Sequence, residues 1–335
     1  MSDIIDNEKN VGKNLIGCIG KLPVYPEFIR CNVSNQNLKQ LDTWLQEGFI
    51  HTSRDQLIRQ QNFQIPTLAQ GLLLNYGAGR KPILGYLTNS QDSYGRSYPL
   101  LLFQELYNLE LEANQHYIPF LYQPIYQAFD SLVNESWDNK TQMDFIGQLF
   151  AIQMLMPNYT NISLKIHMMD ILSGISYQTF WRQIMGLQSF RHASQLLAKI
   201  VNIVTKIPSQ GTWQINFPIA KAQPIFLSIS FWLSLLQALE VFNYRNMHIA
   251  WSMKNEINQR YLTVYHGNLN AAFFRTLLDK QDIRIANIDP LDDYLTDLTL
   301  DYEPYEFEPS IDLQTLINSV VKLHCPKKKE TCDGE

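Results

Sequence analysis

Two arginines with nearby carboxylates are the residues of this sequence best suited to recognition chemistry. Glu27 precedes Arg30 and Asp92 precedes Arg96, in each case within a short segment rather than a long apolar run. An arginine beside a surface carboxylate can simply fix a loop, and such an exposed ion pair contributes little to stability. Loops also carry more than their share of binding residues, so each pair can instead belong to a recognition patch. Both interpretations stay open on the residues alone.

A phosphate-binding loop is suggested at first sight by the segment Gly17-x-x-Gly20-Lys21. A Walker A loop has four residues between its glycines and a Ser or Thr directly after the lysine. Here two residues separate the glycines, and Leu22 follows the lysine. The spacing therefore predicts no nucleotide site.

Catalytic and metal-binding motifs are not apparent elsewhere in the chain. The seven histidines show no H-x-x-x-H or HExxH spacing, and Cys325 and Cys332 lack a second pair of ligands at zinc-binding distance. No G-x-S-x-G nucleophile motif is present. We expect no catalytic residues, no metal and no cofactor. An enzyme whose site has no sequence motif is the alternative.

Composition places the chain among folded proteins. Of its 335 residues 45% are hydrophobic, and the net charge is -5. The acidity argues against a nucleic-acid partner, because phosphate binding needs clustered Lys and Arg. The most apolar window, Ile225 to Phe242, includes Glu240, which is costly inside a bilayer. We expect a buried core helix there, no membrane insertion, no secretory signal at the N-terminus and a cytoplasmic protein.

Strands and helices are expected to alternate along the chain. Strands are expected over 14–22, 82–87, 98–103, 213–217, 247–251 and 261–265, with a polar turn over 89–96. Helices are expected from Ser34 or Asn35 through Leu45 and over 117–133, 141–156, 180–187, 193–204, 225–242 and 269–278. Thr141 and Asp144 have the spacing of a capping box. The pattern predicts an α/β layered fold, in which one continuous mixed sheet and two separate domains are both possible.

The segment before the C-terminus is strongly acidic. Nine Asp and Glu residues occur from Asp289 to Asp312, without a Lys or Arg among them. We expect this tail to be extended or partly ordered. A solvated terminus is the favoured interpretation, and mimicry of a phosphorylated segment is the alternative.

Two segments near the N-terminus resemble the signature of a known family. They are GCIGKLPVYPEFIR at 17–30, followed by LDTWL at 41–45, and DSYGRSYPLL at 92–101. This order of elements is similar to the TagF (ImpM) family of type VI secretion-associated proteins. The matching residues are Gly20, Lys21, Leu22, Pro23, Glu27, Phe28, Arg30, Asp42, Trp44, Asp92, Gly95, Arg96, Tyr98 and Pro99. The family usually has Arg-Gly-Asp-Phe where this chain has Tyr25-Pro26-Glu27-Phe28.

The resemblance implies a non-enzymatic, cytoplasmic accessory protein of the bacterial type VI secretion system. Its relatives resemble post-translational repressors of assembly that act with a forkhead-associated (FHA) scaffold protein. The implied fold is a three-layer α/β/α sandwich, here with a mixed sheet and a helical middle section. We accordingly divide the chain into a flexible N-terminus (1–13), a TagF-like region (14–112), a helical and strand region completing the body (113–285) and the acidic tail (286–335).

The two signature segments define a hypothetical partner-binding site. Its candidate residues are Lys21, Glu27, Phe28, Arg30, Asp92, Tyr94 and Arg96. If strands 15–22 and 98–103 are neighbours, the loops at 21–30 and 89–96 lie side by side. Their basic groups would then meet acidic groups of a partner, with Phe28 or Tyr94 as the apolar anchor. A structural or assembly subunit of the secretion machine is the alternative, and the oligomeric state stays open.

Overall fold

The structure is a computed structural model of the whole chain. It describes residues 4–5, 15–58, 68–75, 81–107, 114–155, 161–185, 190–207, 211–219, 225–241, 247–253, 260–278, 287–288 and 303–324. Cys325 and Cys332 lie outside these ranges, as do Asp289 to Asp301 of the acidic segment.

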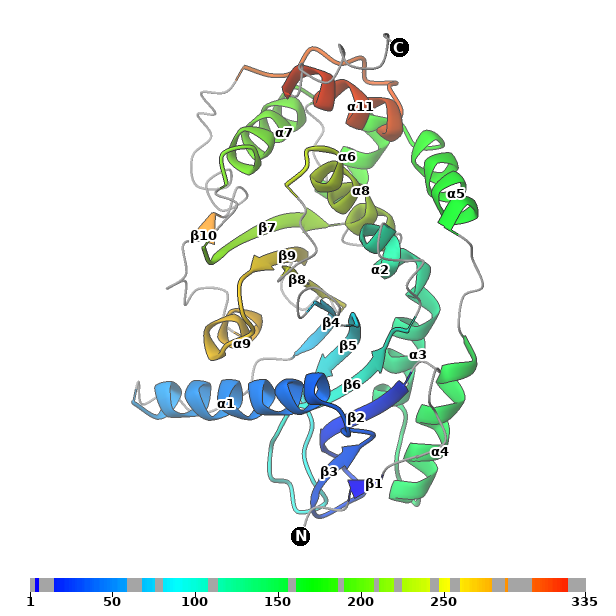
Figure 1. Cartoon of the computed structure of the whole chain (residues 1–335), viewed down its shortest axis with the longest axis vertical. Helices are drawn as coiled ribbons and strands as arrows, with labels where there is room; N and C mark the ends of the chain where they lie inside the picture. The colour runs from blue at the N-terminus through cyan, green and yellow to red at the C-terminus, as the bar shows by residue number, and fades with distance from the viewer. Residues whose placement is uncertain are drawn as a thin grey trace, which may run out of the picture.

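One continuous ten-stranded sheet runs through the molecule (Figure 1). Its order is β1-β3-β2-β6-β5-β4-β8-β9-β7-β10. The strands are β1 (Ile4–Ile5), β2 (Leu15–Lys21), β3 (Phe28–Cys31), β4 (Ala69–Leu74), β5 (Ile83–Thr88), β6 (Leu100–Glu105), β7 (Trp213–Ile219), β8 (Met247–Ser252), β9 (Arg260–His266) and β10 (Asn287–Ile288). Neighbours pair antiparallel except β1 with β3 and β10 with β7, which are parallel. The sheet is therefore mixed. The sequence allowed either one continuous sheet or two separate domains, and the structure has one sheet.

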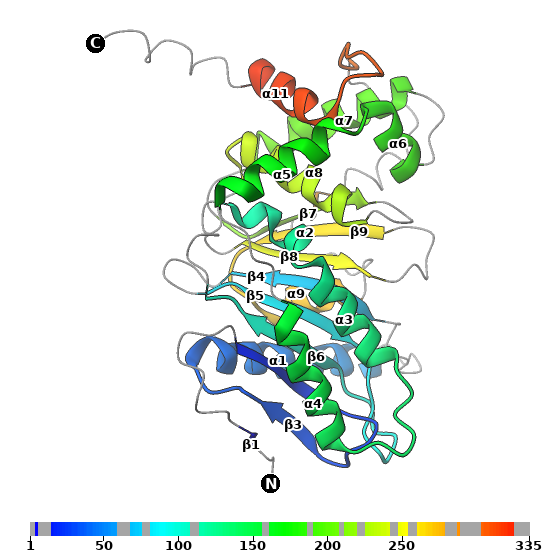
Figure 2. The same ribbon diagram turned by 90° about the vertical axis from the view of Figure 1, so that its right-hand side faces the viewer.

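Helices cover both faces of this sheet, which confirms the three-layer sandwich (Figure 2). The helices α1 (Gln36–Ile58) and α9 (Ala271–Leu278) pack on one face. The other face carries α2 (Ile118–Leu121), α3 (Gln123–Asn134), α4 (Gln142–Ile152), α5 (Asn161–Ser173), α6 (Tyr177–Met185), α7 (Phe190–Val204), α8 (Ile225–Ala238) and α11 (Leu313–His324), with the short 3-10 helix η2 (Gln153–Leu155) after α4. Successive side chains of β2 point to opposite faces of the sheet, so Cys18 belongs to one hydrophobic core and Ile19 to the other.

Local signals in the sequence set several helix boundaries correctly. Asn35 Oδ1 accepts a hydrogen bond from the Leu38 amide at 3.0 Å, so Asn35 caps α1. Thr141 and Asp144 form the expected capping box of α4. The single helix expected over 117–133 is instead two, α2 and α3, each with a proline in its first turn. Proline fits a helix start because it lacks the N–H that a helix interior needs.

Some elements were not predicted because their local pattern is weak. The strand β3 has only four residues, and β4 reads AQGLLL without alternation. The apolar window that begins at Ile225 does form a buried core helix, α8, as expected. Among the residues that the structure describes, no helix is both long and apolar enough to cross a membrane.

The described part of the tail expected over 286–335 packs against the body and is therefore partly ordered, while Glu303, Glu306 and Glu308 of its acidic segment stay exposed. Within 286–335, α11 buries Leu313, Leu316, Ile317 and Val320 in the core. Their spacing of three and four residues places them on one helix face. The backbone before α11 is also tied down, since the amide of Tyr177 donates to Ile311 O at 2.7 Å. At the other end of the chain, β1 of the segment expected to be flexible pairs with Arg30 and Cys31.

A pair of glycine substitutions tests the tightness of the core. A Cβ added at Gly71 of β4 would lie 2.2 Å from Cε2 of the buried Trp251 indole, whereas one at Gly147 of α4 meets nothing within 4 Å. We expect Gly71→Ala to lower the free energy of unfolding by about 1–3 kcal/mol, the usual range for overpacking. Gly147→Ala should raise it by about 0.5–1 kcal/mol, because alanine favours an exposed helix interior. Urea titration of both variants measures this, and equal effects would contradict the packing described.

Candidate functional site

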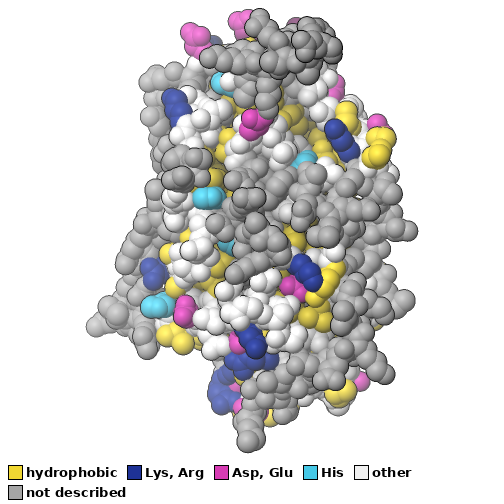
Figure 3. All heavy atoms as spheres, in the orientation of Figure 1, with side chains coloured by type: hydrophobic (Ala, Val, Ile, Leu, Met, Phe, Trp, Pro, Cys, Tyr) yellow, Lys and Arg dark blue, Asp and Glu magenta, His cyan; other side chains and the backbone are white. Residues whose placement is uncertain are grey.

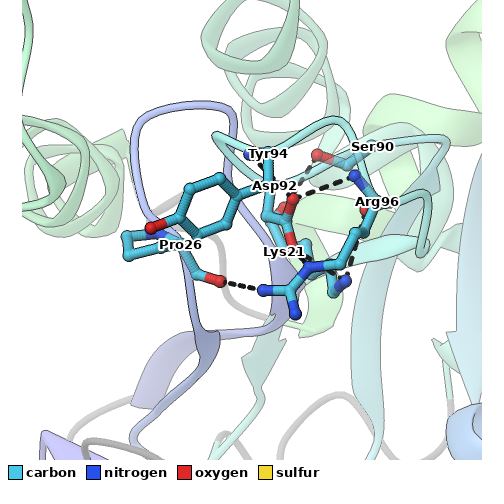
Figure 4. Close-up of polar contacts among 6 residues, drawn as sticks. All are labelled: Lys21, Pro26, Ser90, Asp92, Tyr94 and Arg96. Atoms are coloured by element: carbon cyan, nitrogen blue, oxygen red, sulfur yellow. Dashed lines mark hydrogen bonds and ion pairs between the residues drawn. The ribbon is translucent and has the colours of Figure 1, made fainter.

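The two signature loops lie at the same end of neighbouring strands and contact each other. Because β2 pairs with both β3 and β6, the hairpin loop between β2 and β3 (22–27) lies beside the loop between β5 and β6 (89–97). The guanidinium Nη2 of Arg96 donates to Pro26 O at 2.6 Å, and Ser90 Oγ donates to Lys21 O at 2.7 Å (Figure 4). The amide of Ser93 also donates to Tyr25 O at 3.2 Å. This juxtaposition confirms the predicted placement of the loops.

The carboxylate of Asp92 is the centre of this junction. Its side chain is completely buried, yet it accepts four hydrogen bonds. Oδ2 accepts from Lys21 Nζ at 2.9 Å and from Arg96 Nε at 2.6 Å. Oδ1 accepts from the backbone amides of Tyr94 at 3.0 Å and Arg96 at 2.9 Å. A buried carboxylate is stable only when paired and hydrogen-bonded, and here both conditions hold.

The same contacts hold Asp92 in its ionised form. Burial by itself raises the pKa of this carboxyl, but the hydrogen bonds from Lys21, Arg96 and the Tyr94 amide outweigh it. The pKa of Asp92 therefore lies well below its ordinary value of 3.8. One carboxylate thus pairs with two cations, and the exposed Glu27 supplies a second negative charge on the same pair of loops.

The β5–β6 loop closes on itself through local interactions. The amide of Gly95 donates to Asp92 O at 2.9 Å, and the amide of Asp92 donates to Arg96 O at 3.2 Å. Gly95 has a φ of +79°, a conformation that glycine adopts without strain. Below this turn, Gln91 and Ser97 form an isolated antiparallel bridge. Local backbone hydrogen bonds thus form the turn, and the Asp92 carboxylate stabilises it through further hydrogen bonds.

Arg30 pairs with a different carboxylate from the one near it in sequence. Its Nε donates to Asp42 Oδ2 of α1 at 2.7 Å, and Gln46 Nε2 donates to Asp42 Oδ1 at 2.7 Å. The suggested loop-fixing pair of Glu27 with Arg30 is therefore wrong. Packing of α1 beneath β3 selects Asp42, and this contact joins a helix to a strand rather than fixing the loop. Asp42 belongs to the family signature, but sequence reasoning gave it no role at the site.

Phe28 packs within the molecule rather than projecting from it. Its ring is half-buried, edge-on to Tyr98 at 5.0 Å between centroids, and the Arg30 guanidinium lies 4.4 Å from its centre. Tyr98 in turn contacts Phe49 of α1 at 4.6 Å. Of the two apolar anchors suggested by the sequence, Phe28 thus belongs mainly to this aromatic cluster.

Three side chains remain available to a ligand at the loop junction. Tyr94 is 75% exposed, the side chain of Arg96 is 57% exposed, and Glu27 is exposed. Lys21, at 16% side-chain exposure, is largely covered by its partners. The surface therefore offers an aromatic ring, a partly exposed guanidinium and one carboxylate. Such a set can bind a polar and aromatic surface of another protein.

Metal-ligating side chains and thiols are the remaining groups with possible site chemistry. Within the described ranges of the chain, no three His, Cys, Asp or Glu side chains are placed to hold a metal ion. The free thiols of Cys18 and Cys31 lie directly opposite each other in β2 and β3, and both are buried. The hydrogen bond with Cys31, followed by burial, raises the pKa of the Cys18 thiol well above its ordinary value, so this sulfur is a poor nucleophile.

Comparison with known families assigns this part of the chain to a class of secretion-associated proteins. Residues 17–151 match the model described as the TagF N-terminal domain, type VI secretion system-associated. The match confirms the resemblance to the TagF family over this part of the chain, and the matched residues include every candidate site residue. The protein is therefore associated with the type VI secretion system.

A solved structure covers a longer part of the chain. It is the crystal structure of PA0076 from Pseudomonas aeruginosa PAO1, which is 15% identical, with a TM-score of 0.46. The match covers 81% of this chain and 97% of that chain. No curated protein matches the sequence.

Asp92→Asn tests the role of the buried carboxylate. We expect a lower melting temperature and faster tryptic cleavage after Lys21 and Arg96, because a neutral amide cannot compensate two cations. Since the folded pKa of Asp92 is depressed, its contribution to stability is fully present above pH 3.8 and is lost as the pH falls below that value. The difference in melting temperature between wild type and variant should therefore shrink in acid.

The matched control removes an ion pair that is exposed. Glu135→Gln breaks the contact between Glu135 and Lys140, whose side chains are 40% and 28% exposed. We expect little change in its melting temperature or in loop cleavage. Equal behaviour of the two variants, followed by thermal unfolding and mass mapping of tryptic fragments, would rule out Asp92 as the lock of the junction.

Proposed function

We propose that this chain is a non-enzymatic, cytoplasmic accessory protein of the type VI secretion system that represses its assembly by binding an FHA-domain scaffold protein. One observation carries the proposal. The buried Asp92 carboxylate joins two loops into a single surface and leaves Tyr94 and Arg96 exposed upon it. The family match supplies the association with the secretion system.

The chemistry of this surface favours binding over catalysis. Asp92 is ionised, but both of its oxygens already accept hydrogen bonds, so it is poorly placed to take a proton from a substrate. Lys21 Nζ lies 2.9 Å from the same carboxylate and its side chain is only 16% exposed, so it is poorly placed to attack a substrate. These arguments support a docking role for the loop junction.

Rigidity of the junction also favours binding. Ordering a loop at an interface costs conformational entropy, and a loop that is already ordered avoids most of this cost. Tyr94 sits at the tip of such a loop, where its amide donates to Asp92 and the Arg96 guanidinium lies 5.4 Å from its ring centre. Tyrosine and arginine are enriched among residues that dominate binding energy. We therefore place the centre of the scaffold contact at Tyr94 and Arg96.

Tyr94→Ala tests this docking surface. We expect the affinity of the purified chain for the FHA scaffold protein to fall at least about tenfold, which corresponds to about 1.4 kcal/mol. The matched control is Leu323→Ala on α11, since Leu323 is also an exposed large side chain, at 57%, but lies outside the loops and outside α5. Calorimetric titration with both variants measures the effect. Unchanged affinity of Tyr94→Ala, with wild-type binding intact, would remove this surface from the proposal.

A structural subunit is a second candidate function, and one observation favours it. Ile162, Ile166 and Met169 on α5 are 75%, 55% and 39% exposed and recur at helical spacing. Hydrophobic side chains are visible at the surface in the region of α5 (Figure 3). Exposed apolar side chains that share a helix face can mark a contact within an assembly.

Deletion of the coding sequence distinguishes the two candidates. Loss of a repressor should raise secretion by the type VI system, whereas loss of a structural subunit should stop it. Secretion is measured as the amount of the system's extracellular tube protein in the culture medium, normalised to a cytoplasmic marker. Complementation with the wild-type gene should restore the original level. Abolished secretion in the deletion strain would exclude repression.

A further inference from the structure

A cavity of about 540 Å³ opens beside the loop junction. Its walls come from both loops and from the helical layer that covers this face of the sheet. The lining includes Pro23 of the hairpin loop, Ser90, Gln91 and Ser97 of the β5–β6 loop, and the aromatic side chains Trp137 and Phe145. This volume lies within the range of about 300–1,000 Å³ that is typical of ligand pockets.

The lining of the cavity carries no charge. Its described residues are hydrocarbon, aromatic, hydroxyl and amide side chains only. Lys21 and Arg96 of the adjoining loops are paired with Asp92. Lys140, whose Nζ lies 4.7 Å from the centre of the Trp137 ring, is paired with Glu135. A phosphate or carboxylate ligand would find no uncommitted positive group here, and burying an unpaired charge is costly. The cavity therefore suits an uncharged ligand.

The cavity lining combines buried aromatic rings with exposed polar side chains. Trp137 and Phe145 are buried, with their ring centroids 5.1 Å apart. The indole N–H of Trp137 already donates to Leu132 O at 3.2 Å, so the ring presents hydrocarbon to the cavity without an unmet donor. Gln91 and Ser97, which also line the cavity, are exposed to solvent. Such a lining can accept an apolar side chain on its aromatic rings and can hydrogen-bond peptide groups through Gln91 and Ser97.

We propose that the cavity seats a short uncharged segment of the protein partner. An aromatic or branched aliphatic side chain packs on Trp137 and Phe145, while the adjacent peptide groups bond to Gln91 and Ser97. A protein segment is favoured over a free small molecule because the cavity and the exposed Tyr94 share the β5–β6 loop. A partner bound at Tyr94 would also lie next to the cavity, because the loop that carries Tyr94 forms part of the cavity wall. This inference rests on the proposed binding of the scaffold protein.

Ser97→Trp tests the cavity by placing a bulky side chain in its lining. We expect the affinity for the purified FHA scaffold to fall at least about tenfold in calorimetric titration. Because the lost contacts are uncharged, the fold-change should be the same at about 50 mM and about 500 mM salt, whereas the effect of Arg96→Ala should shrink as salt screens the guanidinium. The matched control is Ser173→Trp, an exposed serine at the end of α5. Near-ultraviolet circular dichroism verifies that both variants fold.

A thiol footprint provides a second measurement that does not depend on a bulky substitution. Ser97→Cys and Ser173→Cys each introduce a reactive thiol, and N-ethylmaleimide labelling is followed by peptide mass mapping. We expect bound scaffold to slow labelling at position 97 at least about tenfold and to leave position 173 unchanged.

The outcomes separate this inference from the proposed function. If the scaffold binds wild type and Ser97→Trp with equal affinity, or leaves labelling at position 97 unchanged, the cavity proposal is wrong and the proposed function stands. If wild type does not bind the scaffold, the proposed function fails and the cavity proposal fails with it. Reduced affinity together with protection at position 97 supports both.

Discussion

A buried carboxylate that compensates two cations is the interaction on which the loop junction depends. Asp92 is sequestered from water and receives hydrogen bonds from Lys21, Arg96 and the amide of Tyr94. Charges can be buried in this way only when every partner is present, because an uncompensated ion in a poorly hydrated site is costly. The position of each loop is therefore determined by the other. Tyr94 is exposed because the hydrogen bonds of its turn are made by Asp92, Gly95 and Arg96 on either side of it.

The sheet provides the frame for that interaction. The order β3-β2-β6-β5 brings the β2–β3 hairpin and the segment before β6 to one edge, and α3 and α4 cover the face beside them. The same frame produces two features with different chemistry. The junction itself is charged and faces outward, while the adjacent cavity is lined by neutral side chains over buried aromatic rings. Both belong to the TagF N-terminal domain, within residues 17–151.

Internal pairing of the signature residues changes how their functional roles are understood. Lys21 and Arg30 are engaged by Asp92 and Asp42, so their main contribution is to position the loops and the helix beneath them. In the proposed function, recognition of a partner then rests on fewer groups, chiefly Tyr94, Arg96 and the neutral cavity. An interface of this composition combines a modest electrostatic attraction with apolar contacts that salt does not weaken. The proposed scaffold contact draws on both.

Interactions between residues close in sequence were determined by the sequence itself. The turn from Asp92 to Arg96, the capping box of α4 and the buried helix α8 depend on local dihedral preferences and apolar composition. Tertiary structure alone decided that Lys21 reaches Asp92 across 71 residues, that Arg30 selects Asp42 over Glu27 and that helices wall the cavity. Such contacts follow from strand register and helix packing, which depend on the free energy of the whole core. Several carboxylates near an arginine in sequence are chemically equivalent until that packing places one of them within reach.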